Sequence, residues 1–183
     1  MKSWIVLAAL LAAPAAHAVE YRTVLPAQSR IGFEFVQMGV KIPGSFKRFA
    51  AQMAFDPAKP ESARATLEID LASIDAGSPE ANEESAGKLW FDRAAFPKAR
   101  FDSTQVRALG DNRFELRGTL AIKGKRRELT IPVQLVPGKA AARFDGSFVL
   151  RRLDFGIGEG MWADVGTVAN EVNVKFSIAA SGK

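Results

Sequence analysis

Three acidic residues near the C-terminal end of the chain lie close enough in sequence to form a catalytic pair. Asp154, Glu159 and Asp164 fall within eleven residues. A pair of carboxylates, one donating a proton and the other acting as base or nucleophile, suffices for glycoside hydrolysis without any histidine. Acidic side chains that follow a strand are more often simply solvated. A hydrolase that uses these carboxylates is therefore an alternative, and not the favoured interpretation.

The chain offers few other groups to an enzyme. It has no cysteine, and its single histidine is His17. His17 lies between two alanines, after a positively charged start and an apolar stretch over residues 4–13, which is the pattern of a secretory signal. We expect residues 1–18 to be a signal peptide cleaved after Ala18, and residues 19–183 to form one domain in the periplasm.

Cleavage at that point would leave no imidazole and no thiolate. These groups serve best for proton transfer at neutral pH, for nucleophilic attack and for binding zinc or copper. We therefore expect no catalytic residue, no metal site and no catalytic cofactor. The glycines at 156, 158 and 160 do not form a dinucleotide-binding fingerprint, because Met161 stands where that pattern needs glycine. They favour a bend at the end of a strand.

Composition points to binding rather than to catalysis. Thirteen phenylalanines stand against one tyrosine, which favours an interior that provides no polar partners. The 25 Lys and Arg and 20 Asp and Glu are scattered, apart from the cluster at 123–127. We expect that cluster to be a solvated hairpin tip. Nucleic acid is not expected as a partner, whereas transient contact with an anionic membrane surface is compatible with this balance.

Hydrophobic residues alternate with polar ones along most of the chain. From Ala63 to Leu71 every second residue is apolar, which is typical of an antiparallel strand with one buried face. The same pattern predicts strands over 31–35, 49–55, 99–107, 113–122, 128–136, 142–150 and 168–179. Short turn signals such as Gly110-Asp111-Asn112 and Lys123-Gly124-Lys125 join them. We therefore expect an all-β antiparallel barrel of eight strands or slightly more, because closure removes exposed edges.

One segment departs from this rhythm. Ser78 can cap a short helix, Pro79 fits its first turn, and acidic residues follow. We expect a short helical insertion near residues 79–90, placed at one end of the barrel as a lid or plug.

Several short motifs follow one another in a set order along the chain. They are Tyr21 through Ser29-Arg30-Ile31-Gly32-Phe33, Gly44-Ser45-Phe46, Phe55-Asp56-Pro57, Leu71-Ala72-Ser73-Ile74-Asp75, Trp90-Phe91-Asp92 with Phe96-Pro97, Arg100-Phe101-Asp102-Ser103, Gly118-Thr119-Leu120-Ala121-Ile122-Lys123-Gly124, and Arg152-Leu153-Asp154-Phe155-Gly156-Ile157-Gly158. In this order they resemble the YceI-like family of exported lipid-binding and polyisoprenoid-binding proteins. The resemblance implies a lipocalin-like barrel whose tunnel holds a long amphiphile: a polyisoprenoid, an isoprenoid quinone or a fatty-acid derivative. Many relatives carry Arg-Asp-x-His-Leu where this chain has residues 82–88, so no role of that histidine carries over.

With this resemblance we expect a row of apolar side chains to line a lipid-binding tunnel. They are Phe33, Phe35, Phe49, Phe55, Leu67, Ile69, Phe101, Leu116, Leu120, Ile131, Val133, Phe148, Val174 and Phe176. Periodicity alone favours a filled core without a cavity, since small barrels are often packed solid, and the resemblance reverses that preference.

Four residues are candidates for the tunnel mouth or a headgroup site. Trp90 and Trp162 suit a boundary between an apolar slot and water, although packing beneath loops would explain them equally. Arg151 and Arg152 could bind an anionic headgroup, or could form a solvated strand end. The expected function is periplasmic binding, transport or storage of an amphiphilic lipid. A stress-related interaction protein with incidental lipid is a further alternative, and whether two barrels pair is left open.

Overall fold

The strands predicted by alternation form one continuous antiparallel sheet. The computed structural model describes residues 19–182, so the expected signal segment 1–18 lies outside the described residues. The strands are β1 (Tyr21–Val24), β2 (Arg30–Gln37), β3 (Val40–Phe46), β4 (Phe49–Ala54), β5 (Arg64–Asp70), β6 (Ile74–Asp75), β7 (Lys98–Gly110), β8 (Arg113–Ile122), β9 (Lys125–Val136), β10 (Ala142–Arg151) and β11 (Glu171–Gly182). The helical elements are short: α1 (Pro79–Glu84), η1 (Pro26–Gln28), η2 (Pro60–Ser62), η3 (Leu71–Ser73), η4 (Arg152–Phe155) and η5 (Gly160–Ala163). No helix among the described residues is long and apolar enough to cross a membrane.

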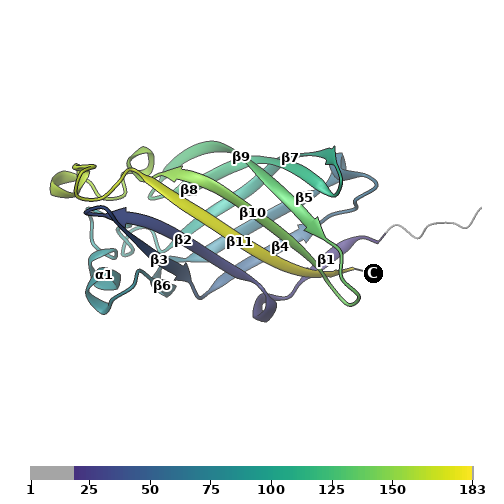
Figure 1. The fold of residues 1–183 in the computed structure, drawn as a ribbon, viewed down its shortest axis with the longest axis horizontal. Helices are drawn as coiled ribbons and strands as arrows, with labels where there is room; N and C mark the ends of the chain where they lie inside the picture. Colours follow the sequence, from purple (N-terminus) through teal and green to yellow (C-terminus); the bar gives the residue numbers. More distant parts are fainter. Residues whose placement is uncertain (1–18, 183) are drawn as a thin grey trace, which may run out of the picture.

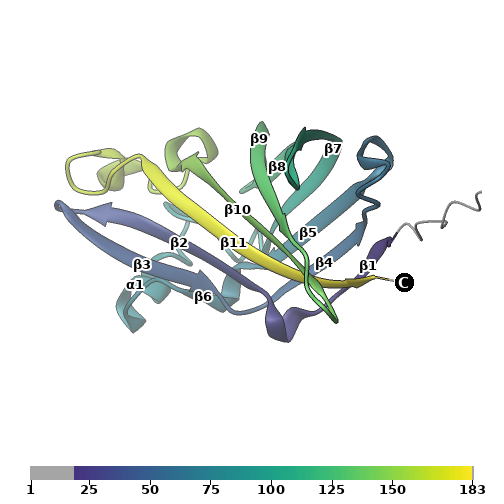
Figure 2. The same ribbon diagram turned by 45° about the vertical axis from the view of Figure 1, so that its right-hand side comes forward.

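The sheet curls on itself into a barrel (Figures 1 and 2). Its strand order is β4-β5-β7-β8-β9-β10-β11-β2-β3-β6, with β1 added beside β11. The order begins with β4 and β5 and ends with β3 and β6. Because β3 continues into β4 and β5 continues into β6 along the chain, the two ends of the sheet meet and close the barrel. Across that corner Asp70 N–H donates to the Arg48 carbonyl (3.1 Å) and Lys47 N–H donates to the Ser73 carbonyl (3.1 Å). Counting each run as one strand and setting β1 apart, the barrel has eight strands, and the predicted fold class is confirmed.

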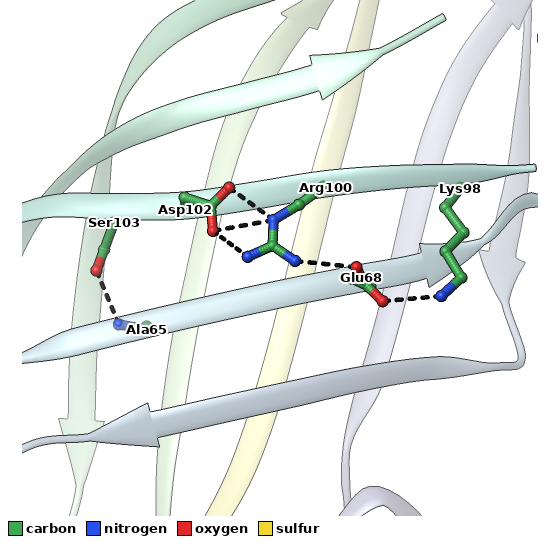
Figure 3. Close-up of polar contacts among 6 residues, drawn as sticks. All are labelled: Ala65, Glu68, Lys98, Arg100, Asp102 and Ser103. Atoms are coloured by element: carbon green, nitrogen blue, oxygen red, sulfur yellow. Dashed lines mark hydrogen bonds and ion pairs between the residues drawn. The ribbon is translucent and has the colours of Figure 1, made fainter. Parts of the chain in front are cut away.

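The pairing register gives each strand an inner and an outer face. Leu67 pairs with Phe101 across β5 and β7, and both side chains face inward. Glu68 and Arg100 are the next pair, and they face outward. Figure 3 shows this outer face, where Glu68 accepts from Lys98 (2.9 Å) and from Arg100 (2.9 Å), and Arg100 also binds Asp102. The hydrogen bond from Lys98 is the largest of the effects that lower the pKa of the Glu68 carboxyl. Exposed ion pairs of this kind add little stability, so most of the stability of the fold comes from packing on the inner face.

Two of the hairpins turn at the predicted positions. Asp111 and Asn112 both have positive φ, as a tight hairpin between β7 and β8 requires. Lys123 and Gly124 do the same between β8 and β9. The strand β3 was not predicted, because Pro43 and Gly44 interrupt its alternation. At the C-terminal end, β11 begins at Glu171 and not at Val168.

Three inward-facing phenylalanines lie over glycines of the neighbouring strand. A Cβ atom on Gly44, Gly118 or Gly146 would collide with the ring of Phe33, Phe101 or Phe176, respectively. Each ring therefore lies over the backbone of a glycine, where no side chain competes for the space. This arrangement keeps large aromatic residues on the inner face without filling the centre of the barrel.

The two ends of the barrel differ. At the end where β1 joins the C-terminus, Phe55 packs edge-on against Phe114 and Phe144, with ring centroids 4.9 and 5.3 Å away. Tyr21 packs against Phe144 at 5.5 Å and is hydrogen-bonded to the Phe55 backbone in both directions. At the opposite end lie α1 and the irregular segment 152–170 (Figure 1). The predicted helical insertion is thus confirmed at one end, with Ser78 Oγ accepting from Ala81 N–H (3.2 Å), but its helix ends at Glu84 and residues 85–90 form turns.

Candidate ligand tunnel

The interior of the barrel holds two adjoining cavities. The larger, about 530 Å³, lies at the α1 end, and the smaller, about 170 Å³, lies deeper in the barrel. They share a wall of five residues: Ile31, Ile69, Leu120, Phe148 and Val174. The larger volume is within the range of pockets that hold small organic ligands. The two cavities together form an apolar path from the α1 end toward the aromatic cluster at the other end.

The predicted tunnel residues lie along this path with one exception. Phe33 and Phe35 line the larger cavity, and Ile69, Leu120, Phe148 and Val174 line both. The smaller cavity alone is lined by Phe55, Leu67, Phe101, Leu116, Ile131, Val133 and Phe176. Phe49 pairs with Ile69 and is half-buried, but it lines neither cavity, because it sits at the corner where β3 runs into β4.

Other lining residues had not been singled out from the sequence. Phe46, Ile74, Ala76, Leu150, Ile157 and Val168 also line the larger cavity. Most of them stand where strands end or bend, so a strict alternation count passes over them. Leu150 is an exception, since it continues the pattern of Phe148 in β10 and could have been found by that signal.

Arg152 organises the segment that covers the mouth. Its guanidinium is buried, with 2% of the residue exposed, and it donates to five backbone carbonyls. Nε donates to Ala169 (3.0 Å), Nη1 to Ile157 and Gly158 (2.9 and 2.8 Å), and Nη2 to Trp162 and Val168 (2.7 and 2.6 Å). A guanidinium has five N–H donors, so none is left for a headgroup. Burial lowers the pKa of the Arg152 guanidinium. Because all five N–H groups bind backbone carbonyls, the side chain holds the loop and not a ligand.

The glycine-rich stretch allows this wrapping. Gly156 and Gly158 have φ of +67° and +75°, which side chains with a Cβ rarely adopt. A Cβ on Gly158 would also collide with the Arg152 guanidinium. The bend expected from these glycines is therefore present. It lets backbone carbonyls on both sides of the bend accept hydrogen bonds from the Arg152 guanidinium. Arg151, by contrast, is exposed and lines neither cavity, so the structure does not bring it to the predicted headgroup site.

The two tryptophans lie side by side at the mouth. Trp90 and Trp162 both line the larger cavity, and their ring centroids are 5.5 Å apart. Trp162 Nε1–H donates to Glu84 Oε1 (2.9 Å), which connects the 152–170 segment to α1. Trp90 Nε1 is buried and has no hydrogen-bond partner among the described residues. Arg152 lies 5.7 Å from the Trp90 ring.

Lys123 connects three segments at this end of the barrel. The cluster at residues 123–127 was expected to be a solvated hairpin tip, but the Lys123 side chain is largely buried. Its Nζ donates to the carbonyls of Lys88 and Gly156 (2.7 Å each) and to Glu159 Oε2 (2.9 Å). The β8–β9 turn, the segment after α1 and the 152–170 segment thus meet at one ammonium group. These contacts fix the frame of the mouth.

Two of the three carboxylates that suggested hydrolysis, Glu159 and Asp164, hold loops. The hydrogen bond from Lys123 is the largest of the effects that lower the pKa of Glu159. Asp164 accepts from Gly166 N–H and Thr167 Oγ1 (2.9 Å each), and the Gly166 bond is the largest effect that lowers its pKa. A general acid needs a raised pKa, so both residues are poorly suited to that part of a glycosidase mechanism.

Exposed apolar side chains gather around the mouth. Five of the eight exposed large hydrophobic residues among those the structure describes lie in turns, loops or element ends at this end: Met38, Val40, Leu89, Met161 and Val165. Met38 and Met161 are 77% and 78% exposed. Met38 N–H donates to the Thr167 carbonyl (2.9 Å), so the β2–β3 turn and the 152–170 segment form one rim.

Comparisons with known proteins agree with this geometry. The family model described as YceI-like domain matches residues 23–180. A UPF0312 protein of Azotobacter vinelandii is 28% identical over 178 residues, covering 93% of this chain and 91% of the relative. The crystal structure of Burkholderia cenocepacia BcnA superposes with a TM-score of 0.84 at 40% identity, covering 86% of this chain and 99% of BcnA.

A more distant structure shares the fold. It is described as a polyisoprenoid binding domain from Saccharophagus degradans, with a TM-score of 0.66 at 16% identity over 91% of this chain and 99% of that one. The order of motifs read from the sequence, the eight-stranded barrel and the family match over residues 23–180 all agree. This chain belongs to the YceI-like family.

Proposed function

We propose that this protein binds a long-chain amphiphilic lipid in its barrel and carries or stores it in the periplasm. The observation that carries the proposal is the apolar path formed by the two cavities, which share five lining residues and reach from the mouth toward the far end of the barrel. The polyisoprenoid binding domain of Saccharophagus degradans has the same fold, which supports an isoprenoid-type tail. A fatty-acid derivative would meet the same lining.

Burial of the tail supplies most of the affinity. Each methylene removed from water contributes about 0.8 kcal/mol, so a tail of about ten methylenes contributes roughly 8 kcal/mol before the costs of ordering and association. One neutral hydrogen bond at a headgroup adds only about 1 kcal/mol. Tail length therefore sets affinity, and the headgroup contact sets orientation.

The exposed rim supports loading from a bilayer. Met38 and Met161 project from two loops beside the mouth, where they can enter the outer part of a lipid layer. A lipid tail could then pass from the bilayer to the cavity with little exposure to water.

The test is extraction of lipid from protein purified from its native source, followed by mass spectrometry. We expect a long-chain amphiphile at close to one molecule per chain. Phe148→Trp enlarges a residue in the wall that the two cavities share and should shorten the retained tail. Val149→Trp is the matched control, because Val149 is 50% exposed on the outer face. Folded wild-type protein that never yields lipid would refute the proposal.

A further inference from the structure

Hydrogen bonds do not close the barrel wall along the outer edge of β4. Phe55, directly after β4, exchanges two backbone hydrogen bonds with Tyr21 of β1 (2.8 and 3.0 Å). In an antiparallel ladder every second residue points its N–H and C=O to the same side, so Ala51 and Met53 also point theirs away from β5. Among residues 19–182 no strand pairs with this edge beyond Tyr21, and no hydrogen bond reaches the two residues from that side. Since backbone groups shielded from water are almost always paired, water must reach this edge.

This unpaired edge is one side of a seam in the wall. The seam extends from the last pair between β2 and β3, Ile31 with Phe46, to the contact between β1 and β4. The smaller cavity lies directly behind the seam, because residues from both of its sides line that cavity: Ala51 and Met53 from β4, Val24 from β1 and Ile31 from β2. Val24, Ala51 and Met53 are partly exposed. At residue 51 only a methyl group stands between the cavity and the unpaired edge.

A long tail that enters from the mouth meets a closed end. Straight ahead, Phe55 packs edge-on against Phe114 and Phe144, with ring centroids 4.9 and 5.3 Å away. The smaller cavity holds only about 170 Å³, which is less than pockets for organic ligands usually offer. The end of a long tail must therefore stop at the aromatic cluster or turn aside through the wall.

We propose that the seam is a second opening of the ligand path, through which the end of a tail longer than the barrel interior passes to the outside. A barrel with this opening accepts tails that exceed its own length, whereas a blind tunnel rejects them. The inference rests on the proposed function, since it assigns the exit of the same lipid tail.

Labelling of the tail end tests the exit. Lipid-free protein is loaded with solanesol, a long isoprenoid alcohol, or with farnesol, a much shorter one, each carrying an azide at the far end of its tail. The complexes are then treated with a cyclooctyne attached to a polymer too large to enter the barrel. In wild-type protein we expect the azide of bound solanesol to react and the azide of bound farnesol to be protected, because only the longer tail projects into water.

Two adjacent alanines provide the variant and its control. Ala51→Trp places an indole in the seam, so labelling per molecule of bound solanesol should fall about tenfold. Ala50→Trp adds the same side chain to the exposed neighbour in β4 and should leave the labelling unchanged.

The outcomes separate the exit from lipid binding. Wild-type protein that retains neither alcohol would contradict the proposed lipid binding itself. Retention of farnesol alone, an unreactive solanesol azide, or equal labelling in the two variants would overturn the exit while lipid binding stands. If Ala51→Trp fails to fold, solanesol with a photoreactive diazirine at its tail end gives the answer in wild-type protein. Its crosslinks should map to residues 49–54, and crosslinks confined to Phe114 and Phe144 or to the mouth would overturn the inference.

Discussion

Replacing Arg152 with methionine should destabilise the protein severely. The substitution keeps an unbranched apolar stem but removes all five hydrogen bonds of the guanidinium. Ile157, Gly158 and Val168 are buried, so their carbonyls would lose a partner with no access to water. Each unsatisfied carbonyl costs about 1–3 kcal/mol, while the desolvation cost of the cation is recovered. We expect a net loss of about 3–4 kcal/mol in the free energy of unfolding.

For a domain of this size 1 kcal/mol corresponds to about 2–4 °C in Tm, so Arg152→Met should melt about 10 °C below wild type. Circular dichroism on heating measures this, and hydrogen exchange should show faster exchange over residues 152–170. Arg151→Met is the matched control, since Arg151 is the exposed neighbour and should shift Tm little. If the two variants melt at the same temperature and only Arg152→Met loses bound lipid, the structural role is refuted. Arg152 would then be a residue that binds the lipid headgroup.

Three further perturbations probe the wall, the rim and the mouth. Gly118→Ala places a methyl group against the Phe101 ring and 2.5 Å from the Asp102 carbonyl oxygen, and should cost about 2–3 kcal/mol by chemical denaturation; an unchanged midpoint would contradict the packing argument. The double change Met38→Glu and Met161→Glu should reduce cosedimentation with phosphatidylcholine vesicles, whereas Leu109→Glu on β7 should not; equal losses would contradict a docking rim. In the folded protein the pKa of the Glu159 carboxyl is lowered, mainly by the hydrogen bond from Lys123. The ion pair between Glu159 and Lys123 is therefore fully formed above the usual carboxyl pKa, and it is lost as the pH falls through the lowered value. Bound lipid should therefore leave faster below about pH 4, and Glu159→Gln should release it at one rate across that range.

The strands with strict alternation could be predicted from the sequence. Leu67 and Ile69 alternate with Thr66 and Glu68, and a period of two leaves little choice about which face is buried. The turns at 111–112 and 123–124 could also be predicted, because asparagine and glycine tolerate the positive φ that a hairpin needs. Where Pro43 and Gly44 break the period, the strand β3 was missed.

The mouth could be predicted only in outline. The sequence placed Trp90 and Trp162 near it. The period of two in β10 puts residue 152 on the inner face and Arg151 on the outer face, but nothing local shows what would satisfy a buried guanidinium there. Its hydrogen bonds depend on backbone from residues 157–169 folding back over the side chain, which is a long-range arrangement. Likewise, the pairing of Phe33 with Gly44 depends on strand register rather than on either residue alone.

The pairing of β1 with the end of β11 has a practical consequence. Tyr21 pairs with Gly182, and this pair lies at the end of the barrel opposite α1 (Figure 1). A short linker could therefore join residues 21 and 182, and new ends could be opened at residues 111–112 without touching the mouth of the larger cavity. A protein fixed to a sensor surface through residue 182 would likewise present its opening to the solution, so lipid exchange could be followed on the immobilised molecule.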